Sequence, residues 1–233
     1  MEAVRNFNVR EFILGTAITT SLFLVVVLSP VIGFVFCLLA PLPIALFTWR
    51  MGRVPGITML LLSIGLLAAV FKIGGFVESL PFFLVLGSAG ILIPEVLRRV
   101  QGIEAAVGLS VVAYLALIGA ALLGYSLAVD RSVADIVRSY VDESVRYSLA
   151  LYEEIGLPRE QIEQLKESAP EVAAWVVHHG PALLVTGVTF FVWLNVLGLR
   201  LLSQGRDPAF PDFGDLACWK MPDWVVWFVI AAG

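Results

Sequence analysis

The chain has 233 residues, of which 59% are hydrophobic and 15% are charged, and its mean hydropathy is +0.92. A soluble domain carries about 25% charged residues and has no place for this much apolar surface, so the composition excludes a soluble protein. The net charge is −4, and the sequence has no basic tract interleaved with aromatic residues, so nucleic acid is excluded as a partner. The sequence therefore predicts a protein whose main partner is the lipid bilayer.

The uncharged residues 12–49 predict two membrane spans rather than one. As a single helix they would extend about 57 Å, nearly twice the thickness of the hydrocarbon core of a bilayer. Pro30 is the best break point, which places the first span at about 12–28 and the second at about 31–48.

Four more apolar segments predict spans at about 54–71, 80–97 (starting as early as 76), 105–129 and 181–202. A seventh apolar run, 224–233, has ten residues, whereas a span needs about twenty. We therefore predict an all-α, polytopic transmembrane helical bundle with six spans plus the start of a seventh, in a protein that continues beyond residue 233.

The segment 130–171 is strongly polar, with ten acidic and five basic residues, and it predicts an ordered insert between the fifth and sixth spans. Ser132, three residues before Asp135, is typical of a helix N-cap. Apolar residues at helical spacing then predict an amphipathic helix to about Ile155, followed by a shorter helix over 158–165. We expect the apolar stripe of the insert to pack back onto the bundle.

The chain therefore divides into three predicted regions: spans 1–5 over 1–129, a helical insert over 130–171, and span 6 with a loop and a truncated span 7 over 172–233. The short arginine clusters near residues 50, 98 and 200 all fall on one side of this topology. By the positive-inside rule that side is cytoplasmic. We therefore expect a cytoplasmic N-terminus in a bacterial inner membrane, with residues 130–171 outside the cell membrane.

No catalytic motif stands out in the sequence, which lacks the nucleophile elbow, the zinc-protease helix, paired cysteines and a glycine-rich phosphate loop. His178 and His179 are adjacent, so on a helix they point about 100° apart and seldom share one metal ion. They are better read as an interfacial pair than as a metal site. We therefore expect neither an enzyme nor a cofactor.

Three residues inside predicted spans are candidates for ligand binding, and each also has a structural explanation. Pro41 and Pro43 remove two backbone donors inside span 2; such breaks line binding sites in some transporters and merely kink other helices. Asn195 is a polar residue at membrane depth, which favours either an interhelical hydrogen bond or a contact with a ligand.

Small residues predict close helix packing in spans 4 and 5. Ala116, Ala120 and Gly124 recur every four residues and would let a neighbouring backbone approach. The run 87–90 in span 4 is expected to be a packing notch rather than a phosphate site. Glu95 is expected to pair locally with the arginine at 98 or 99.

Three segments together resemble a known bacterial family, the YybS-type membrane proteins, which have no assigned function. They are Pro41-Leu-Pro43 with Arg50-Met-Gly52, the span with Pro181, Asn195 and Arg200, and the segment containing Trp219, Pro222, Asp223 and Trp224. The resemblance covers nearly the whole chain, and its most specific part is the tryptophan–proline–aspartate–tryptophan segment.

The spans of that family are also similar to the S components of energy-coupling-factor vitamin transporters. This resemblance implies a bundle that captures a small-molecule solute from outside and associates with a membrane coupling partner, for which the small residues of span 1 would be the docking face. The alternative is a non-transporting structural or scaffold protein of the cell envelope that binds a partner through its outer insert.

Overall fold

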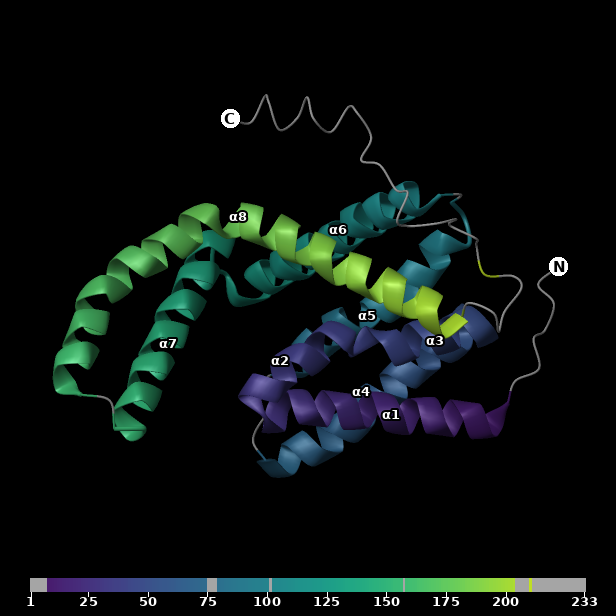
Figure 1. The fold of residues 1–233 in the computed structure, drawn as a ribbon, viewed down its shortest axis with the longest axis horizontal. Helices are drawn as coiled ribbons and strands as arrows, with labels where there is room; N and C mark the ends of the chain where they lie inside the picture. The colour runs from purple at the N-terminus through teal and green to yellow at the C-terminus, as the bar shows by residue number, and fades with distance from the viewer. Residues whose placement is uncertain (1–7, 75–78, 101, 157, 204–209, 211–233) are drawn as a thin grey trace.

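The computed structural model describes residues 8–74, 79–100, 102–156, 158–203 and 210. The regular structure in this part of the chain is entirely α-helical (Figure 1). The helices, in chain order, are α1 (Val9–Leu28), α2 (Pro30–Leu39), α3 (Pro41–Met51), α4 (Arg53–Gly74), α5 (Leu80–Leu97), α6 (Ile103–Val129), α7 (Val133–Glu154) and α8 (Arg159–Ser203).

Six stretches among these helices are long and apolar enough to cross a membrane, which confirms the predicted all-α membrane bundle. They are Val9–Leu28, Gly33–Met51, Arg53–Lys72, Leu80–Leu97, Ile103–Val129 and Glu160–Ser203. Each contains one of the six spans predicted from the sequence or most of it. The expected start of a seventh span, 224–233, lies outside the described residues.

The second span is broken, as its two prolines predict. α2 ends at Leu39 and α3 begins at Pro41, with Ala40 between them in a helical conformation. A proline has no N–H, so Pro41 and Pro43 cannot donate to the carbonyls of the preceding turn. The break interrupts the hydrogen bonding but leaves α2 and α3 as successive parts of one membrane crossing.

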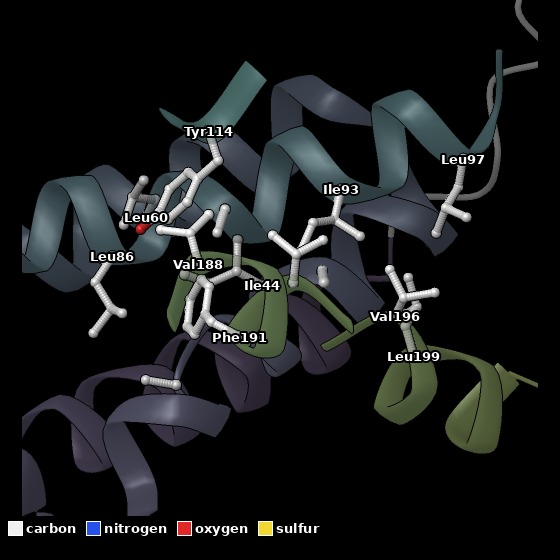
Figure 2. Packing of buried hydrophobic residues seen from close by; sticks show 14 of the residues in the cluster. Ile44, Leu60, Leu86, Ile93, Leu97, Tyr114, Val188, Phe191, Val196 and Leu199 are labelled. Carbon is white, nitrogen blue, oxygen red and sulfur yellow. The ribbon is translucent and has the colours of Figure 1, made fainter. Parts of the chain in front are cut away.

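α3 forms the centre of the bundle, because it packs against α1, α4, α5 and α8. Its buried side chains include Ile44, Ala45 and Trp49. In Figure 2, side chains of α5, α6 and α8, among them Ile93 and Phe191, gather around Ile44. Lipid tails are as apolar as these side chains, so within a bilayer the helices are held together by close packing rather than by the hydrophobic effect.

α7 and the first half of α8 form a hairpin that projects from one end of the bundle (Figure 1). Ser132 caps α7 as predicted, since its hydroxyl accepts a hydrogen bond from the backbone N–H of Asp135 at 3.1 Å. Gly156 adopts a positive φ of 78° just after α7, a conformation that favours glycine. The apolar stripe of α7 packs mainly on α8 and less on α6, rather than back onto the other spans as expected.

The short helix expected over 158–165 is the beginning of a much longer one. α8 has 45 residues and runs without interruption to Ser203, so the expected end near Leu165 is wrong and the boundary expected at 171/172 falls inside a helix. A helix of this length extends about 68 Å, enough to cross a bilayer and continue well beyond it. Pro170 and Pro181 lie inside α8 but are exposed, where water can pair with the carbonyls that they leave without a donor.

The two ends of the bundle differ in the charged residues that they carry. The start of α1, the junction of α3 with α4, the end of α5 and the end of α8 lie at one end, and they carry Arg10, Arg50, Arg53, Arg98 and Arg200 (Figure 1). The hairpin lies at the opposite end (Figure 1). This arrangement matches the topology from which the orientation was predicted.

Candidate functional site

The break at Pro41 and Pro43 is closely packed by neighbouring helices. Pro41 is buried, and α5 approaches it at Gly90, where an added Cβ would lie 2.6 Å from the Pro41 carbonyl oxygen. A Cβ at Gly87 would clash with the side chain of Leu60 and would lie 3.2 Å from that of Ile44. The run 87–90 is therefore a packing notch for α3 and α4, as predicted.

Asn195 brings α8 against the other side of the same break. Its side chain is fully buried, and its amide Nδ2 donates to the Leu38 carbonyl and to the Phe191 carbonyl, both at 2.8 Å. In an unbroken helix, the residues at the positions of Pro41 and Pro43 would each donate to the carbonyl four residues earlier. Leu38 lies between these two carbonyls, in the last turn of α2. Asn195 thus makes the interhelical hydrogen bond that was one of its two predicted roles. This bond links span 6 to the broken span 2.

The other amide atom of Asn195, Oδ1, is buried without a hydrogen-bond partner among the described residues. Because both bonds of Nδ2 go to carbonyl oxygens, exchanging the two amide atoms would set oxygen against oxygen, which fixes the orientation of the amide. An unpaired buried acceptor costs free energy in an apolar medium. Asn195 Oδ1 could therefore accept a hydrogen bond from a donor that enters the bundle.

Arg98 of α5 contacts the end of α3 that the positive-inside rule predicts to face the cytoplasm. One of its guanidinium nitrogens donates to the carbonyls of Thr48 and Trp49 at 2.7 and 2.8 Å, and its guanidinium carbon lies 5.3 Å from the centre of the Trp49 ring. Glu95 pairs with both Arg98 and Arg99, at 3.7 and 2.7 Å, which confirms the local pairing predicted for it. The contact of Arg98 with a helix fifty residues away was not predicted, because no local pattern signals it.

The small residues Ala116, Ala120 and Gly124 do not pack against a neighbouring helix within the described part of the chain. All three are exposed, and an added Cβ at Gly124 would meet nothing within 4 Å. Close approach occurs instead at Gly15 of α1, where a Cβ would lie 2.5 Å from Phe47, and at the α5 notch. The close helix packing predicted for this stripe is therefore not made among the described residues.

Two grooves run along the hairpin, one on each side of the seam between α7 and α8. The first, of about 440 Å³, is lined by both polar and apolar residues, among them Arg138, Asp142 and His178. The second, of about 410 Å³, is lined by aromatic, aliphatic and small residues, among them Tyr140 and Tyr152.

Among the described side chains, the contacts that hold the hairpin together include a buried isoleucine and an ion pair across its helices. Ile162 is buried, and Lys166 Nζ lies 2.8 Å from Glu153 Oε1. The hydrogen bond from Lys166, together with its positive charge, lowers the pKa of Glu153 below its ordinary value. His179 Nδ1 donates a hydrogen bond to the Trp175 carbonyl at 2.9 Å, and no cluster of metal-ligating side chains occurs within the described residues.

The tryptophan–proline–aspartate–tryptophan segment lies outside the described residues, so the structure does not place Trp219, Pro222, Asp223 or Trp224. No curated protein and no solved structure matches the chain. A family model described as a predicted membrane protein (DUF2232) matches residues 17–233. The match confirms the expectation of an uncharacterised family of polytopic membrane proteins; the finer YybS-type assignment and the likeness to S components stay predictions. With six apolar helices and this match over most of its length, the chain belongs to the DUF2232 family of predicted membrane proteins.

Proposed function

We propose that this membrane protein is a non-enzymatic scaffold of the cell envelope, whose projecting hairpin binds another protein. The observation that carries this proposal is the hairpin itself. It extends beyond the bundle on α7 and the first half of α8, and it leaves Tyr140, Tyr147 and Trp175 more than half exposed. Exposed aromatic side chains beside an apolar groove are typical of protein-binding surfaces.

The proposed orientation places the hairpin outside the cytoplasm of a bacterial cell, with the N-terminus inside. It is supported by the arginines at the opposite end of the bundle and by the acidic character of 130–171. A reporter domain fused after Arg146 should then be active only outside the cytoplasm. Activity of a cytoplasmic reporter at this position would reverse the orientation.

Site-specific photo-crosslinking in native membranes tests the scaffold function. A photoreactive amino acid at Tyr140, on the groove, should capture an external protein reproducibly. The matched control is the same amino acid at Arg146, which is exposed on the other side of α7 and should capture that protein much less. Crosslinks from Tyr140 to the chain's own helices alone would refute the scaffold function.

The second candidate is an S-component-like bundle that binds a small-molecule solute and associates with a membrane coupling partner. The observation that favours it is the unpaired Asn195 Oδ1 beside the broken span 2. A ligand present at a hundred times its Kd should stabilise the protein by about 2.7 kcal/mol, which a thermal-shift screen of vitamins and nucleobases would detect. The shift should vanish in Asn195→Leu, and a screen without any shift counts against this candidate.

A further inference from the structure

Two backbone carbonyls at the break in the second span lack their helical donors. Pro41 and Pro43 have no N–H, so the carbonyls four residues before each of them receive no helical hydrogen bond. These are the carbonyls of Cys37 and Leu39, and none of the described side chains donates to either. The last turn of α2 therefore presents two carbonyl oxygens that can accept from another donor.

Asn195 places a third oxygen beside this turn. Its amide nitrogen donates, at 2.8 Å, to the carbonyl of Leu38, which lies between those of Cys37 and Leu39. Successive carbonyl oxygens of a helix lie about 4 Å apart, so the amide is adjacent to all three carbonyls. Asn195 Oδ1 is buried and has no hydrogen-bond partner among the described residues. The break thus gathers three acceptor oxygens that belong to neutral groups.

Close contacts on both sides along α8 enclose this group of oxygens. One turn before Asn195, the ring of Phe191 stacks on that of Tyr114, with 5.5 Å between the ring centres. About one turn after Asn195, an added Cβ at Gly198 would lie 2.9 Å from Leu42 Cδ1, so α8 and α3 meet there without a gap. An occupant of the position between these contacts must therefore be small.

The break lies near the middle of its membrane crossing. Along the helix axis, Pro41 is about 12 Å from Gly33 and about 15 Å from Met51, the two ends of the apolar stretch. Hydrocarbon offers no water to replace a missing donor, so unpaired carbonyls are costly at this depth. The last carbonyls of α2 also carry the negative end of its helix dipole. A positive charge at this position would therefore be stabilised by all three oxygens.

The charged residues near the end of α5 are engaged away from the break. Arg98 donates to the carbonyls of Thr48 and Trp49, about 10 Å farther along α3 than the break. Glu95 pairs with Arg98, and α2, α3, α5 and the half of α8 that contains Asn195 carry no other carboxylate. These helices therefore lack the carboxylate ligands through which Mg²⁺ and Ca²⁺ are ordinarily bound.

We infer that the break binds a dehydrated monovalent metal cation, Na⁺ or K⁺, through Asn195 Oδ1 and the carbonyls of Cys37 and Leu39. Neutral oxygens replace the hydration shell of alkali ions, and the interrupted helices of transporters supply such oxygens. A single water molecule has two donors, too few for three oxygens. The inference goes beyond the scaffold function and does not rest on it, because it concerns the middle of the membrane rather than the hairpin.

Thermal unfolding of the full-length protein in a mild detergent tests the inference. The chloride salts of sodium, potassium and choline are compared at equal ionic strength, without any organic solute. Sodium or potassium should raise the midpoint above its value in choline, by about 4 °C at ten times the Kd, and the more potent of the two identifies the ion. Equal midpoints in all three salts, or a rise produced only by magnesium or calcium, would overturn the inference.

Restoring the two missing donors tests whether the response arises at the break. The double variant Pro41→Ala, Pro43→Ala gives the carbonyls of Cys37 and Leu39 helical hydrogen bonds in place of the cation. The variant should fold, because alanine favours a helix, and its midpoint should rise by less than about 1 °C in sodium or potassium. The control Pro181→Ala restores a donor at an exposed position of α8 and should keep the shift of the parent. A full shift in the double variant would contradict the site.

Direct binding of the ion to the parent protein keeps the inference testable if the double variant does not fold. Radioactive sodium, or rubidium as a substitute for potassium, should bind saturably and be displaced by the unlabelled ion but not by choline. Asn195→Leu removes Oδ1 and should weaken this binding at least about tenfold. The control Thr189→Ala, on the same helix, should leave it unchanged, because the Thr189 hydroxyl donates to the Val185 carbonyl of its own helix. Absence of saturable binding to the parent would refute the inference.

Discussion

Replacing Asn195 tests whether one amide holds the last described span against the broken one. Asn195→Ala removes the donors to the carbonyls of Leu38 and Phe191. An interhelical hydrogen bond within a membrane contributes about 0.6 kcal/mol on average and about 1.7 kcal/mol at most. Truncation of a fully buried side chain adds a packing loss of about 1 kcal/mol. We therefore expect the free energy of unfolding to fall by about 1–3 kcal/mol.

Asn195→Asp is the sharper substitution, because it keeps the shape of the side chain and changes only its hydrogen-bonding chemistry. An ionised carboxylate has no donor, and a protonated carboxyl has one in place of the two that Nδ2 uses. At least one of the two carbonyls would then face an acceptor oxygen, which costs about 1–3 kcal/mol when buried. We expect Asn195→Asp to be more destabilising than Asn195→Ala.

The measurement is unfolding by increasing mole fractions of a denaturing detergent, starting from the protein in a mild detergent and followed by circular dichroism and tryptophan fluorescence. The control is Thr189→Ala on the same helix, because Thr189 is exposed and its hydroxyl donates only to the Val185 carbonyl of its own helix. Asn195→Asp as stable as the parent, or Asn195→Ala no less stable than the control, would refute the reasoning.

Three further substitutions have expected outcomes in the same unfolding assay or a related one. Gly90→Ala should lose about 1–3 kcal/mol through overpacking, whereas Gly65→Ala, where an added Cβ meets nothing within 4 Å, should be neutral or stabilising. Arg98→Ala should lose about 1–2 kcal/mol, because two carbonyls of α3 lose a charged donor, and a loss confined to low salt would contradict this. Lys166 lowers the pKa of Glu153, so the ion pair stabilises the hairpin above that residue's ordinary pKa and this contribution is lost as the pH falls through the lowered value. Hydrogen-exchange protection of the hairpin should therefore fall in acid in the parent, and Glu153→Gln should lack this part of the pH dependence.

The features that the sequence predicted correctly depend on local physics. The N-cap at Ser132 and the pairing of Glu95 with the arginines at 98 and 99 involve residues three or four apart, whose geometry a helix fixes by itself. The spans follow from length and hydropathy, because a bilayer demands about twenty apolar residues per crossing. The break at Ala40 follows from the missing donors of the two prolines beside it.

The features that the sequence did not predict depend on contacts between distant segments. Pro170 and Pro181 favour helix boundaries locally, yet α8 continues through both of them, since packing on α7 and α6 supports the helix. The stripe at Ala116, Ala120 and Gly124 has the spacing of a packing face but is exposed, whereas the run 87–90, predicted as a packing notch, does meet α3. Spacing shows that a close approach is possible and does not show which helix makes it.

Asn195 illustrates the same limit at the candidate site. Its polarity at membrane depth singled it out, and the break at Pro41 and Pro43 was singled out independently. Their connection through the Leu38 carbonyl, 157 residues away in sequence, is visible only in the fold. The hydrogen bond accounts for the amide nitrogen and leaves Oδ1 unpaired, so it explains the stability of the bundle more completely than it explains solute binding.

Exposed apolar side chains on the spans and on the hairpin lie in different surroundings, so their exposure has different consequences. On the spans, Leu61, Leu62 and Phe190 are exposed, but a bilayer covers them and no partner is needed. Tyr140 and Tyr147 are more exposed, and they lie on a polar, acidic helix that projects from the bundle, where the alternative to a partner is water. Burial there would contribute about 25 cal/mol per Å² of apolar surface, a gain that burial against another helix within lipid does not offer. The free-energy gain available from association is therefore concentrated on the hairpin, which is why the partner should be sought there.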